Sequence, residues 1–390
     1  MLGHLIDAWK EMRRAWAGLR RFQQLPRETK RFVFYAESRA DWAFLEPVAE
    51  ALKRRGNEVV RVVSDPTDPV LEQPYAFFVG MGTPRTILFR SIEADAFIMT
   101  LSDLNSYHLK RSAHPVHYFY IFHSIASTHR VYRKHAFDAY DTILCVGPHH
   151  VEEIRKTEEV YGLKPKKLLK HGYGRLDTLM HDMARQAGAQ RKSGGATRVL
   201  VAPTWGPSSL VEHGLEGMLE LLLKQGYEVT MRVHPMTQRH EPDLAHALAK
   251  RLANVGSLQI DPHVDTTQAL LDADIMISEW SGAPLEYAFA RLRPVIFIDT
   301  PPKVNNSEFG RIGLPCLEED IRGQIGHITL PGHWEEIPKR IDELLRESDA
   351  WKDRIREVRD KTVYNVGSSG EVGADFLVGA LEQKQAVKHE

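Results

Sequence analysis

Short apolar runs alternate with amphipathic helical segments along most of the chain after Pro26. Residues 31–38, "RFVFYAES", predict a strand, and residues 44–56 predict a helix that ends at Gly56. Further strands are predicted at 57–65, 95–104, 117–124 and 141–148, and a helix at 149–162. Strands that alternate with helices are typical of a parallel sheet covered by helices on both faces.

A second alternating series begins at Arg198, after the polar, glycine-bearing residues 186–198, which we interpret as a linker. Its strands are predicted at 198–206, 228–235, 258–262, 274–279 and 294–299, with helices between them, and a helix from Gly282 to Arg291. The charged tail 334–360 is helical in pattern, and a last helix is expected near Ser368. We therefore expect an α/β protein in which two Rossmann-like domains, 26–185 and 199–390, face a central cleft.

The first 25 residues have a different pattern, that of an amphipathic helix with aromatic residues on its apolar side. The apolar positions are Leu2, Leu5, Ile6, Trp9, Met12, Trp16, Leu19 and Phe22. The basic residues fall largely between them and are Lys10, Arg13, Arg14, Arg20 and Arg21. Such a helix can lie in the interface of an anionic membrane. It can equally pack on its own domain or on a partner chain, and the sequence leaves both alternatives open.

Composition narrows the functional classes. The chain of 390 residues is 43% hydrophobic and 26% charged, as in soluble globular proteins, and its formal net charge of -1 argues against a nucleic-acid partner. Two cysteines, Cys145 and Cys316, indicate neither a disulfide framework nor a zinc cluster, which favours the cytosol. No run is long enough to span a bilayer, and no signal-peptide pattern is found.

Several familiar ligand motifs are missing. Gly80-Met81-Gly82 lacks the third glycine of a dinucleotide fingerprint, and no Walker-type phosphate loop occurs, so neither hydride transfer nor ATP hydrolysis is indicated. Asp272 and Asp274 have an Asp-x-Asp spacing, but we interpret them as turn carboxylates because one ends a predicted helix and the other begins a strand. We expect no metal site and no cofactor.

Polar motifs stand where four predicted segments end. They are "IFHSIASTHR" with His123 and Ser124, "HGYGRLDTL" with Tyr173, Arg175 and Asp177, "RVHP" with Arg232 and His234, and the turn Glu279-Trp280-Ser281-Gly282. In open parallel sheets, ligands bind beyond the carboxyl ends of the strands, and a helix N-terminus attracts anions. Ser281 is also a suitable N-cap, and single histidines are often structural, so each motif has a simpler alternative.

Together these residues have a consistent chemistry. A neutral imidazole, His123 or His234, can remove a proton from an acceptor hydroxyl. The other histidine, or Arg175 or Arg232, can stabilise charge on a phosphate.

The ordered set "HGYGRLD", "VLVAPTWG", "RVHP" and "LLDADIMISEWSGAPLEYAFARLRPVIFID" resembles the CDP-glycerol glycerophosphotransferase family of teichoic-acid and capsule polymer enzymes. The resemblance covers roughly Ile121 to Asp299. It implies a GT-B fold, no essential metal, and work at the cytoplasmic membrane face, which the basic N-terminal helix would suit. The implied partners are CDP-glycerol or a related CDP-polyol as donor and a glycan or lipid-linked acceptor. An oligomer is compatible with the sequence.

Site residues follow from the resemblance by position. His123 matches the family's candidate base, with Ser124 beside it, and His234 matches the histidine placed by the donor phosphates. The other implied donor-binding residues are Thr204, Arg232, Glu279, Trp280, Ser281 and Gly282. Arg175 and Asp177 match a motif that we assign to phosphate or acceptor binding. Glu279 is a candidate for the ribose or polyol hydroxyls.

Four positions depart from the family pattern. Ser124 and Gly174 stand where the family has Gly and Pro, Glu279 replaces Asp, and Gly282 replaces Ser. These departures leave open three alternatives to glycerol-phosphate transfer: a GT-B glycosyltransferase that uses a nucleotide sugar, a nucleotide-sugar 2-epimerase, and a catalytically silent subunit of a polymer-assembly complex.

Overall fold

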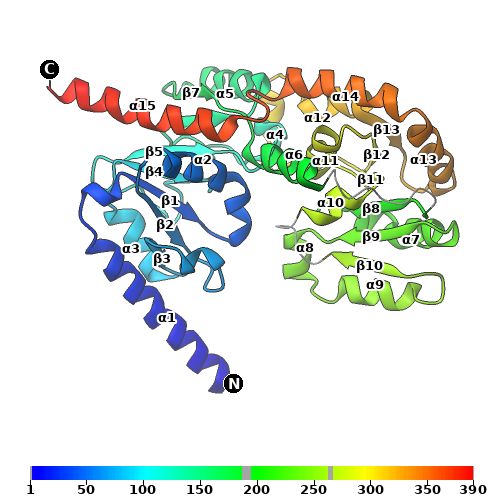
Figure 1. Cartoon of the computed structure of the whole chain (residues 1–390), viewed down its shortest axis with the longest axis horizontal. Helices are drawn as coiled ribbons and strands as arrows, with labels where there is room; N and C mark the ends of the chain where they lie inside the picture. The colour runs from blue at the N-terminus through cyan, green and yellow to red at the C-terminus, as the bar shows by residue number, and fades with distance from the viewer. Residues whose placement is uncertain (1, 187–194, 262–266, 390) are drawn as a thin grey trace. The chain divides into compact units, whose positions relative to one another are not determined.

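The chain forms two compact units in the computed structural model, which describes residues 2–186, 195–261 and 267–389. Unit 1 comprises Met1–His123, Tyr132–Arg175 and Val363–Glu390, and unit 2 comprises Ser124–Val131 and Leu176–Thr362. Each unit contains one sheet with helices packed on it (Figure 1). The prediction of two Rossmann-like domains is confirmed, and the central cleft stays a prediction.

The sheet of unit 1 has the order β3-β2-β1-β4-β5-β6-β7, and all its described pairs are parallel. The strands are β1 Phe32–Ala36, β2 Val59–Val63, β3 Ala76–Phe78, β4 Ala96–Met99, β5 His117–Ile121, β6 Thr142–Cys145 and β7 Lys167–Lys170. Phe32 of β1 lies opposite Val59 on one side and Ala96 on the other. The strand order therefore reverses between β1 and β4, where ligands bind in such sheets.

Helices cover both faces of this sheet. They are α1 Leu2–Gln23, α2 Trp42–Arg54, α3 Thr83–Ser91, α5 Pro148–Tyr161 and α15 Ser369–His389. Phe32 and Phe34 of β1 share a core cluster with Leu45 of α2 and Leu377 of α15, whereas Tyr35, the next residue, packs edge-on against Phe89 of α3. Alternate residues of one strand thus anchor helices on opposite faces.

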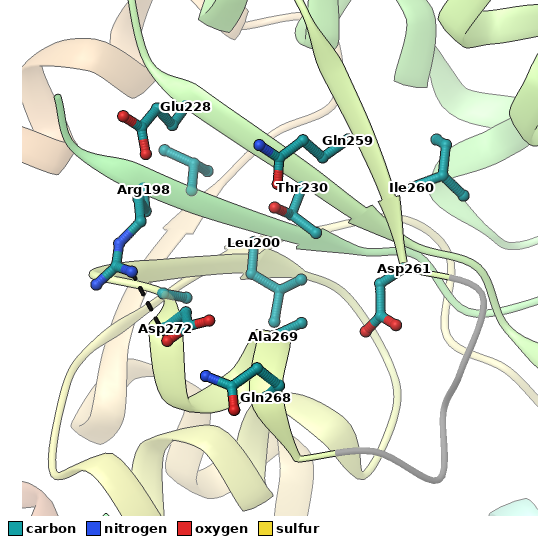
Figure 2. A pocket seen from close by; sticks show the side chains of 12 residues that line it. Arg198, Leu200, Glu228, Thr230, Gln259, Ile260, Asp261, Gln268, Ala269 and Asp272 are labelled. Carbon is teal, nitrogen blue, oxygen red and sulfur yellow. Dashed lines mark ion pairs between the residues drawn. The ribbon is translucent and has the colours of Figure 1, made fainter. Parts of the chain in front are cut away.

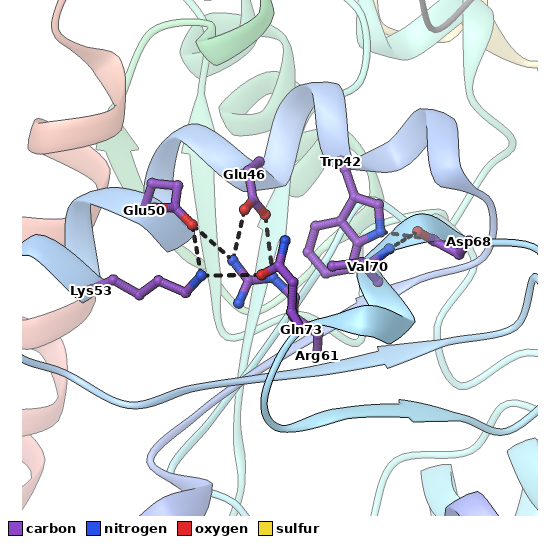
Figure 3. A network of polar contacts seen from close by, with 8 residues as sticks. All are labelled: Trp42, Glu46, Glu50, Lys53, Arg61, Asp68, Val70 and Gln73. Atoms are coloured by element: carbon purple, nitrogen blue, oxygen red, sulfur yellow. Dashed lines mark hydrogen bonds and ion pairs between the residues drawn. The ribbon is translucent and has the colours of Figure 1, made fainter.

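A buried arginine fastens α2 to the sheet (Figure 3). Arg61 of β2 has no exposed side-chain surface, and its Nη2 atom lies 2.7 Å from Glu46 Oε1 and 3.2 Å from Glu50 Oε1. The guanidinium also lies 5.5 Å from the ring centroid of Trp42. Because removing one partner would leave a buried charge unpaired, this network fixes how α2 lies on β2.

The sheet of unit 2 repeats the same topology, in the order β10-β9-β8-β11-β12-β13 with parallel pairing throughout. Its strands are β8 Arg198–Ala202, β9 Glu228–Arg232, β10 Leu258–Asp261, β11 Ile275–Ser278, β12 Val295–Ile298 and β13 Gly326–Thr329. Its reversal point lies between β8 and β11, the strands that precede Thr204 and Glu279.

The helices of unit 2 surround this sheet. They are α4 Thr128–Val131, α7 Leu215–Lys224, α8 Pro235–His240, α9 Leu244–Leu252, α10 Gln268–Asp272, α11 Ala283–Arg291, α12 Leu317–Ile325, α13 Ile337–Arg346 and α14 Ser348–Thr362, with α6 Gly174–Gln186 largely in this unit. One core cluster joins β8, β9 and β11 to α7, α9 and α13.

The predicted N-terminal helix is present as α1, and its two halves differ. Ala15, Leu19 and Phe22 are buried, and α1 contacts β3 and α3. Trp9 and Met12, one to two turns earlier, are 60% and 42% exposed. The second half of α1 is therefore part of unit 1, whereas residues 7–14, which include apolar and basic side chains, are exposed to solvent.

The units differ from the predicted domain boundaries. We placed 199–390 in one domain, but residues 363–390 group with unit 1, because α15 packs along α2 (Figure 1). Ser124–Val131 conversely groups with unit 2. Most of the predicted linker 186–198 lies outside the described residues.

Candidate functional site

The polar residues predicted for the donor side follow the carboxyl ends of neighbouring parallel strands in unit 2. Thr204 follows β8, His234 follows β9, and Glu279–Gly282 follow β11. Because β9, β8 and β11 are adjacent in the sheet, these residues lie at one edge of it. This placement agrees with the strand-end prediction.

His234 is the N-cap of α8, and its Nδ1 atom accepts a hydrogen bond from the backbone N–H of Met236 at 3.1 Å. An imidazole nitrogen that accepts carries no proton, so Nε2 carries the proton of the neutral ring. Burial, and secondarily the positive charge of Lys303, lower the pKa of His234 to about 4. At neutral pH His234 is thus an uncharged donor through Nε2–H.

Two residues outside the predicted set, Trp205 and Lys303, lie beside His234. The centroid of the Trp205 ring lies 6.2 Å from that of His234, and Lys303 Nζ lies 3.9 Å from the Trp205 ring centroid. Burial lowers the pKa of Lys303 to about 8, so its ammonium group is charged at neutral pH but weakly hydrated. Trp205 follows β8 in "PTWG" and Lys303 follows β12, and that strand-end position was the available signal.

Glu279 lies at the reversal point between β8 and β11 with only 1% of its surface exposed. Its Oε1 atom accepts the backbone N–H groups of Thr204 at 2.8 Å and Leu210 at 2.9 Å, while its buried Oε2 has no partner among the described residues. Burial raises the pKa of Glu279 to about 7. These contacts make Glu279 a support for the 204–210 loop, and they do not present it to a ribose or polyol.

Trp280 lies between basic side chains from two other segments of unit 2. Arg322 of α12 is 3.5 Å and Arg130 of α4 is 4.8 Å from its ring centroid, measured from Cζ, and both arginines are buried. The indole Nε1–H donates to the carbonyl of Thr300 at 2.5 Å. Arg130 and Arg322 therefore fix the orientation of the turn, and neither was predicted because both lie far from it in sequence.

The expectation that Ser281 caps the following helix is wrong. Helix α11 begins at Ala283 with Gly282 as its N-cap, and no side chain caps it. The Ser281 hydroxyl has no hydrogen-bond partner in the part of the chain that the structure describes. The N-terminus of α11 is thus left without the side-chain oxygen that usually satisfies its N–H groups.

His123 belongs to unit 1 and follows β5. Its Nδ1 atom lies 3.2 Å from the carbonyl oxygen of Thr100 and 3.4 Å from the Tyr120 hydroxyl. A carbonyl only accepts, so Nδ1 carries the proton and Nε2 has the free lone pair. Burial lowers the pKa of His123, opposed by the negative charge of Asp41; the ring itself stays accessible to solvent, so its hydration is only partly lost.

Three predicted residues are engaged in other contacts. Arg232 is buried and pairs with Asp261 through Nε at 2.8 Å and Nη2 at 2.7 Å, so its charge is already balanced within β9 and β10. Arg175 is buried in unit 1 with Cζ 5.9 Å from the Phe44 ring centroid. Asp177 is half-buried on α6 in unit 2. None of them is placed beside His234 by a described contact.

Asp272 and Asp274 end α10 and precede β11, as predicted for turn carboxylates. Asp274 accepts the backbone N–H of Arg198 at 3.0 Å and pairs with Arg293 at 3.1 Å. No group of side chains suited to a metal ion is found among residues 2–186, 195–261 and 267–389. These aspartates tie the amino ends of β8 and β11, the edge opposite to the candidate site.

A cavity of about 440 Å³ lies over the sheet face of β8, β9 and β10 (Figure 2). Arg198, Glu228, Thr230 and Gln259 are among the residues that line it, and an ion pair of 3.7 Å joins Arg198 to Asp272. It includes none of the strand-end residues Thr204, His234 or Glu279–Gly282, so we assign it no part in the candidate site.

Residues 123–301 match the family model described as CDP-Glycerol:Poly(glycerophosphate) glycerophosphotransferase. This match confirms the family resemblance. It includes His123, His234 and the whole turn Glu279–Gly282. The sequence matches no curated protein.

Solved structures that resemble this glycerophosphotransferase-like chain establish the fold. A wall teichoic acid polymerase TagF variant soaked with CDPG is 15% identical, with a TM-score of 0.60 over 98% of this chain and 97% of that one. UDP-GlcNAc 2-epimerase from Methanocaldococcus jannaschii, in complex with UDP-GlcNAc and UDP, is 11% identical. Its TM-score is 0.59, and the match covers 90% of this chain and 99% of the epimerase chain. A glycosyltransferase from Rickettsia africae is 13% identical, with a TM-score of 0.54 over 90% of this chain and 98% of the glycosyltransferase chain. The fold is GT-B-like.

Two departures from the family pattern are spatially coupled within unit 2. The backbone of Gly282, with φ −72° and ψ −26°, admits any residue. A Cβ atom at this position, however, would lie 2.9 Å from Ser124 Oγ. The family pattern has Gly at 124 and Ser at 282, and this chain has the reverse. The Ser124 hydroxyl therefore lies close to where a side chain at position 282 would begin.

A third departure has a similar steric reason. A Cβ atom at Gly174 would lie 2.9 Å from Pro47 Cγ and 3.4 Å from the carbonyl oxygen of Phe44, both in α2. A proline at 174, as in the family pattern, would collide with the proline inside α2. The glycine at 174 is therefore explained by its packing against Pro47.

Proposed function

We propose that this protein is a transferase that moves glycerol-phosphate, or a related polyol-phosphate, from a CDP-activated donor to a hydroxyl of a glycan or lipid-linked acceptor in cell-surface polymer synthesis. The observation that carries the proposal is the family match over 123–301, which contains both histidines and the turn at 279–282. The TagF structure with CDPG, which has a similar fold, supports the choice of donor.

On the donor side, four groups of unit 2 are assigned to the pyrophosphate. They are His234 Nε2–H, the Lys303 ammonium, the Ser281 hydroxyl and the uncapped N-terminus of α11. A neutral imidazole donor and a weakly hydrated ammonium both strengthen contacts with phosphate oxygens at low cost in desolvation. Arg232 is no longer needed as a source of charge, because Asp261 neutralises it.

The chemical step is a displacement at phosphorus. The acceptor oxygen attacks the phosphorus distal to cytidine, its proton passes to Nε2 of His123, and the bond from that phosphorus to the bridging oxygen breaks to release CMP. Nε2 suits this role because the Thr100 carbonyl fixes the proton on Nδ1. The lowered pKa of His123 keeps the base unprotonated at neutral pH.

The N-terminal half of α1 is assigned to an anionic membrane surface at the cytoplasmic face. Exposed Trp9 and Met12 would enter the interface, and Lys10 and Arg13 would contact anionic headgroups. Among the described residues, no helix has both the length and the apolar character to cross a bilayer.

The membrane assignment is tested by sedimentation with vesicles. Trp9→Ala combined with Met12→Ala should reduce binding to vesicles that contain phosphatidylglycerol, while vesicles of phosphatidylcholine alone should bind neither protein. Equal binding of the variant and the parent protein would contradict this assignment.

Calorimetric titration with CDP-glycerol, CMP, UDP and UDP-sugars tests the donor. Selective binding of cytidine nucleotides that His234→Ala weakens at least tenfold supports the proposal. His246→Ala is the control, since His246 is exposed on α9. Preference for uridine nucleotides would indicate a glycosyltransferase or an epimerase instead. No binding of any nucleotide would indicate a silent subunit.

A further inference from the structure

A second cavity, of about 210 Å³, lies in unit 1 beyond the carboxyl ends of β1, β4 and β5. It is lined by Tyr35, Glu37, Asp41, Thr100, Ser102 and His123, among others. All of these residues belong to unit 1, so the cavity is complete within one compact unit. It lies at the reversal point of the sheet, where ligands of such folds bind.

Asp41 is held in one orientation at the wall of this cavity. Its Oδ2 atom accepts the backbone N–H groups of Glu37 and Ser38, both at 2.9 Å, and its Oδ1 atom accepts the Thr100 hydroxyl at 3.0 Å. A carboxylate offers about four lone-pair positions. Oδ1, which uses one, therefore keeps capacity for a further donor from a ligand.

Glu37 is the second carboxylate, and 38% of its side chain is exposed. Its Oε1 atom accepts from Arg85 Nη1 at 2.9 Å, and its Oε2 atom has no partner in the described parts of the chain. Two carboxylates therefore line the cavity, no Lys or Arg side chain is among its described lining residues, and the guanidinium of Arg85 pairs with Glu37. With a neutral His123, the cavity carries a net negative charge and an excess of hydrogen-bond acceptors.

We propose that this cavity binds a neutral sugar or polyol unit with adjacent hydroxyl groups, in which Glu37 and Asp41 each accept a hydrogen bond from one hydroxyl and a third hydroxyl is presented to His123 Nε2. The identification of the third hydroxyl as the attacking one rests on the proposed function. An acceptor whose terminal unit already bears a phosphate near that hydroxyl should bind more weakly, because the two carboxylates repel the phosphate charge. At separations near 6 Å this repulsion weakens binding by about tenfold to a hundredfold.

Matched pairs of small ligands test the proposal. Methyl glucoside is compared with glucose 6-phosphate, and glycerol with glycerol 3-phosphate, by ligand-observed NMR titration of the full chain. The neutral member of each pair should bind at least tenfold more tightly. Glu37→Gln should weaken the neutral ligands about tenfold, because a hydrogen bond to a charged acceptor is lost, and should narrow the gap within each pair.

The control variant is Glu58→Gln, which removes a carboxylate from an exposed position just before β2 and should change neither affinity. His123→Gln keeps a polar side chain and should still bind methyl glucoside, since the carboxylates hold it. Tighter binding of the phosphorylated members, or no binding of the neutral ones, overturns the proposal, as does a Glu37→Gln variant indistinguishable from Glu58→Gln.

Calorimetry with CDP-glycerol on the same proteins separates this inference from the proposed function. Donor binding that is unaffected by Glu37→Gln, together with preference for the phosphorylated ligands, refutes only the inference. Absence of donor binding together with preference for methyl glucoside refutes only the proposed function.

Discussion

Residues 124 and 282 each depart from the expected family pattern, and the two positions lie next to each other in the structure. Each departure, taken alone, suggested a damaged site. The Ser124 Oγ atom lies 2.9 Å from where a Gly282 Cβ would stand, so the two positions cannot both carry a hydroxymethyl group without a shift. Ser124 also accepts the N–H of Ala126 at 3.1 Å, which fixes its hydroxyl.

Gly282→Ser should therefore destabilise unit 2 by about 1–3 kcal/mol, because the added Cβ is overpacked against Ser124. The double variant Ser124→Gly with Gly282→Ser should recover most of this lost stability. It should also recover any donor affinity that Gly282→Ser loses. Urea denaturation of both single variants and the double variant measures the coupling. Gly323→Ser, at a site with open space on α12, should show no coupling to Ser124→Gly. An uncoupled pair would mean that the exchange is accidental.

Glu279 should make the stability of the protein depend on pH. Its folded-state pKa of about 7 lies above the ordinary value of 4.5, so its stabilising contribution is fully present below about 4.5 and is lost as pH rises through 7. The loss is about 3 kcal/mol. Glu279→Gln keeps a carbonyl acceptor for Thr204 and Leu210 and should flatten the profile between pH 5 and 8.

Unfolding free energies from urea titrations at several pH values measure this effect. Glu228→Gln, at an exposed position of β9, is the control and should retain the slope of the parent protein. A parallel profile for Glu279→Gln would show that the buried carboxyl is not the titrating group.

Helix α15 packs closely on α2, which is far from it in the sequence. A Cβ atom at Gly370 would lie 2.6 Å from the carbonyl oxygen of Pro47, which is backbone and cannot turn aside. Gly379 on the same helix has nothing within 4 Å of the corresponding position. Gly370 thus permits the close approach of α15 to α2, whereas Gly379 is not required for it.

Gly370→Ala should consequently lower the melting temperature, with a loss of about 1–3 kcal/mol from the collision. Gly379→Ala should be neutral or stabilising by up to about 1 kcal/mol, because alanine favours the helix. Thermal denaturation of the two variants decides the point. Equal destabilisation would show that the loss of glycine, and not the contact, is responsible.

Predictability from sequence also differs between elements. The central strands were predicted because their apolar runs are continuous, as in β1 and β12. The edge strands β3, β7 and β13 were missed, because β3 has only three residues and the sequences of β7, KLLK, and β13, GHIT, contain few apolar residues. At the site, strand ends located His123, His234 and Glu279. Lys303, Arg130 and Arg322 were not identified, because their roles depend on contacts between distant segments.

At the scale of the whole molecule, the two compact units are not two consecutive halves of the sequence. Residues 363–390 complete unit 1, where Leu377 is fully buried beside Leu45 and Val48 of α2. Sequence periodicity indicated the helix but could not show which sheet it covers, because an amphipathic face fits any apolar surface.

Leu377→Ala should destabilise unit 1 by about 2–5 kcal/mol, the usual cost of truncating a buried leucine. Hydrogen exchange measured by mass spectrometry should then accelerate in peptides from 32–99 and remain unchanged in peptides from 198–298. Leu219→Ala, which truncates an equally buried leucine in unit 2, should give the reverse pattern. Acceleration in both regions with either variant would indicate a single cooperative unit.

The return of α15 to α2 also has a consequence for biosynthesis. A ribosome adds about 5–20 residues per second, so the apolar side of α2 waits on the order of tens of seconds, while 176–362 are made, before its covering helix emerges. Unit 1 therefore stays incomplete until residues 363–390 have been made, whereas unit 2 ends at Thr362 and can fold before then. Chaperones that bind exposed apolar segments during synthesis should therefore recognise the N-terminal half preferentially.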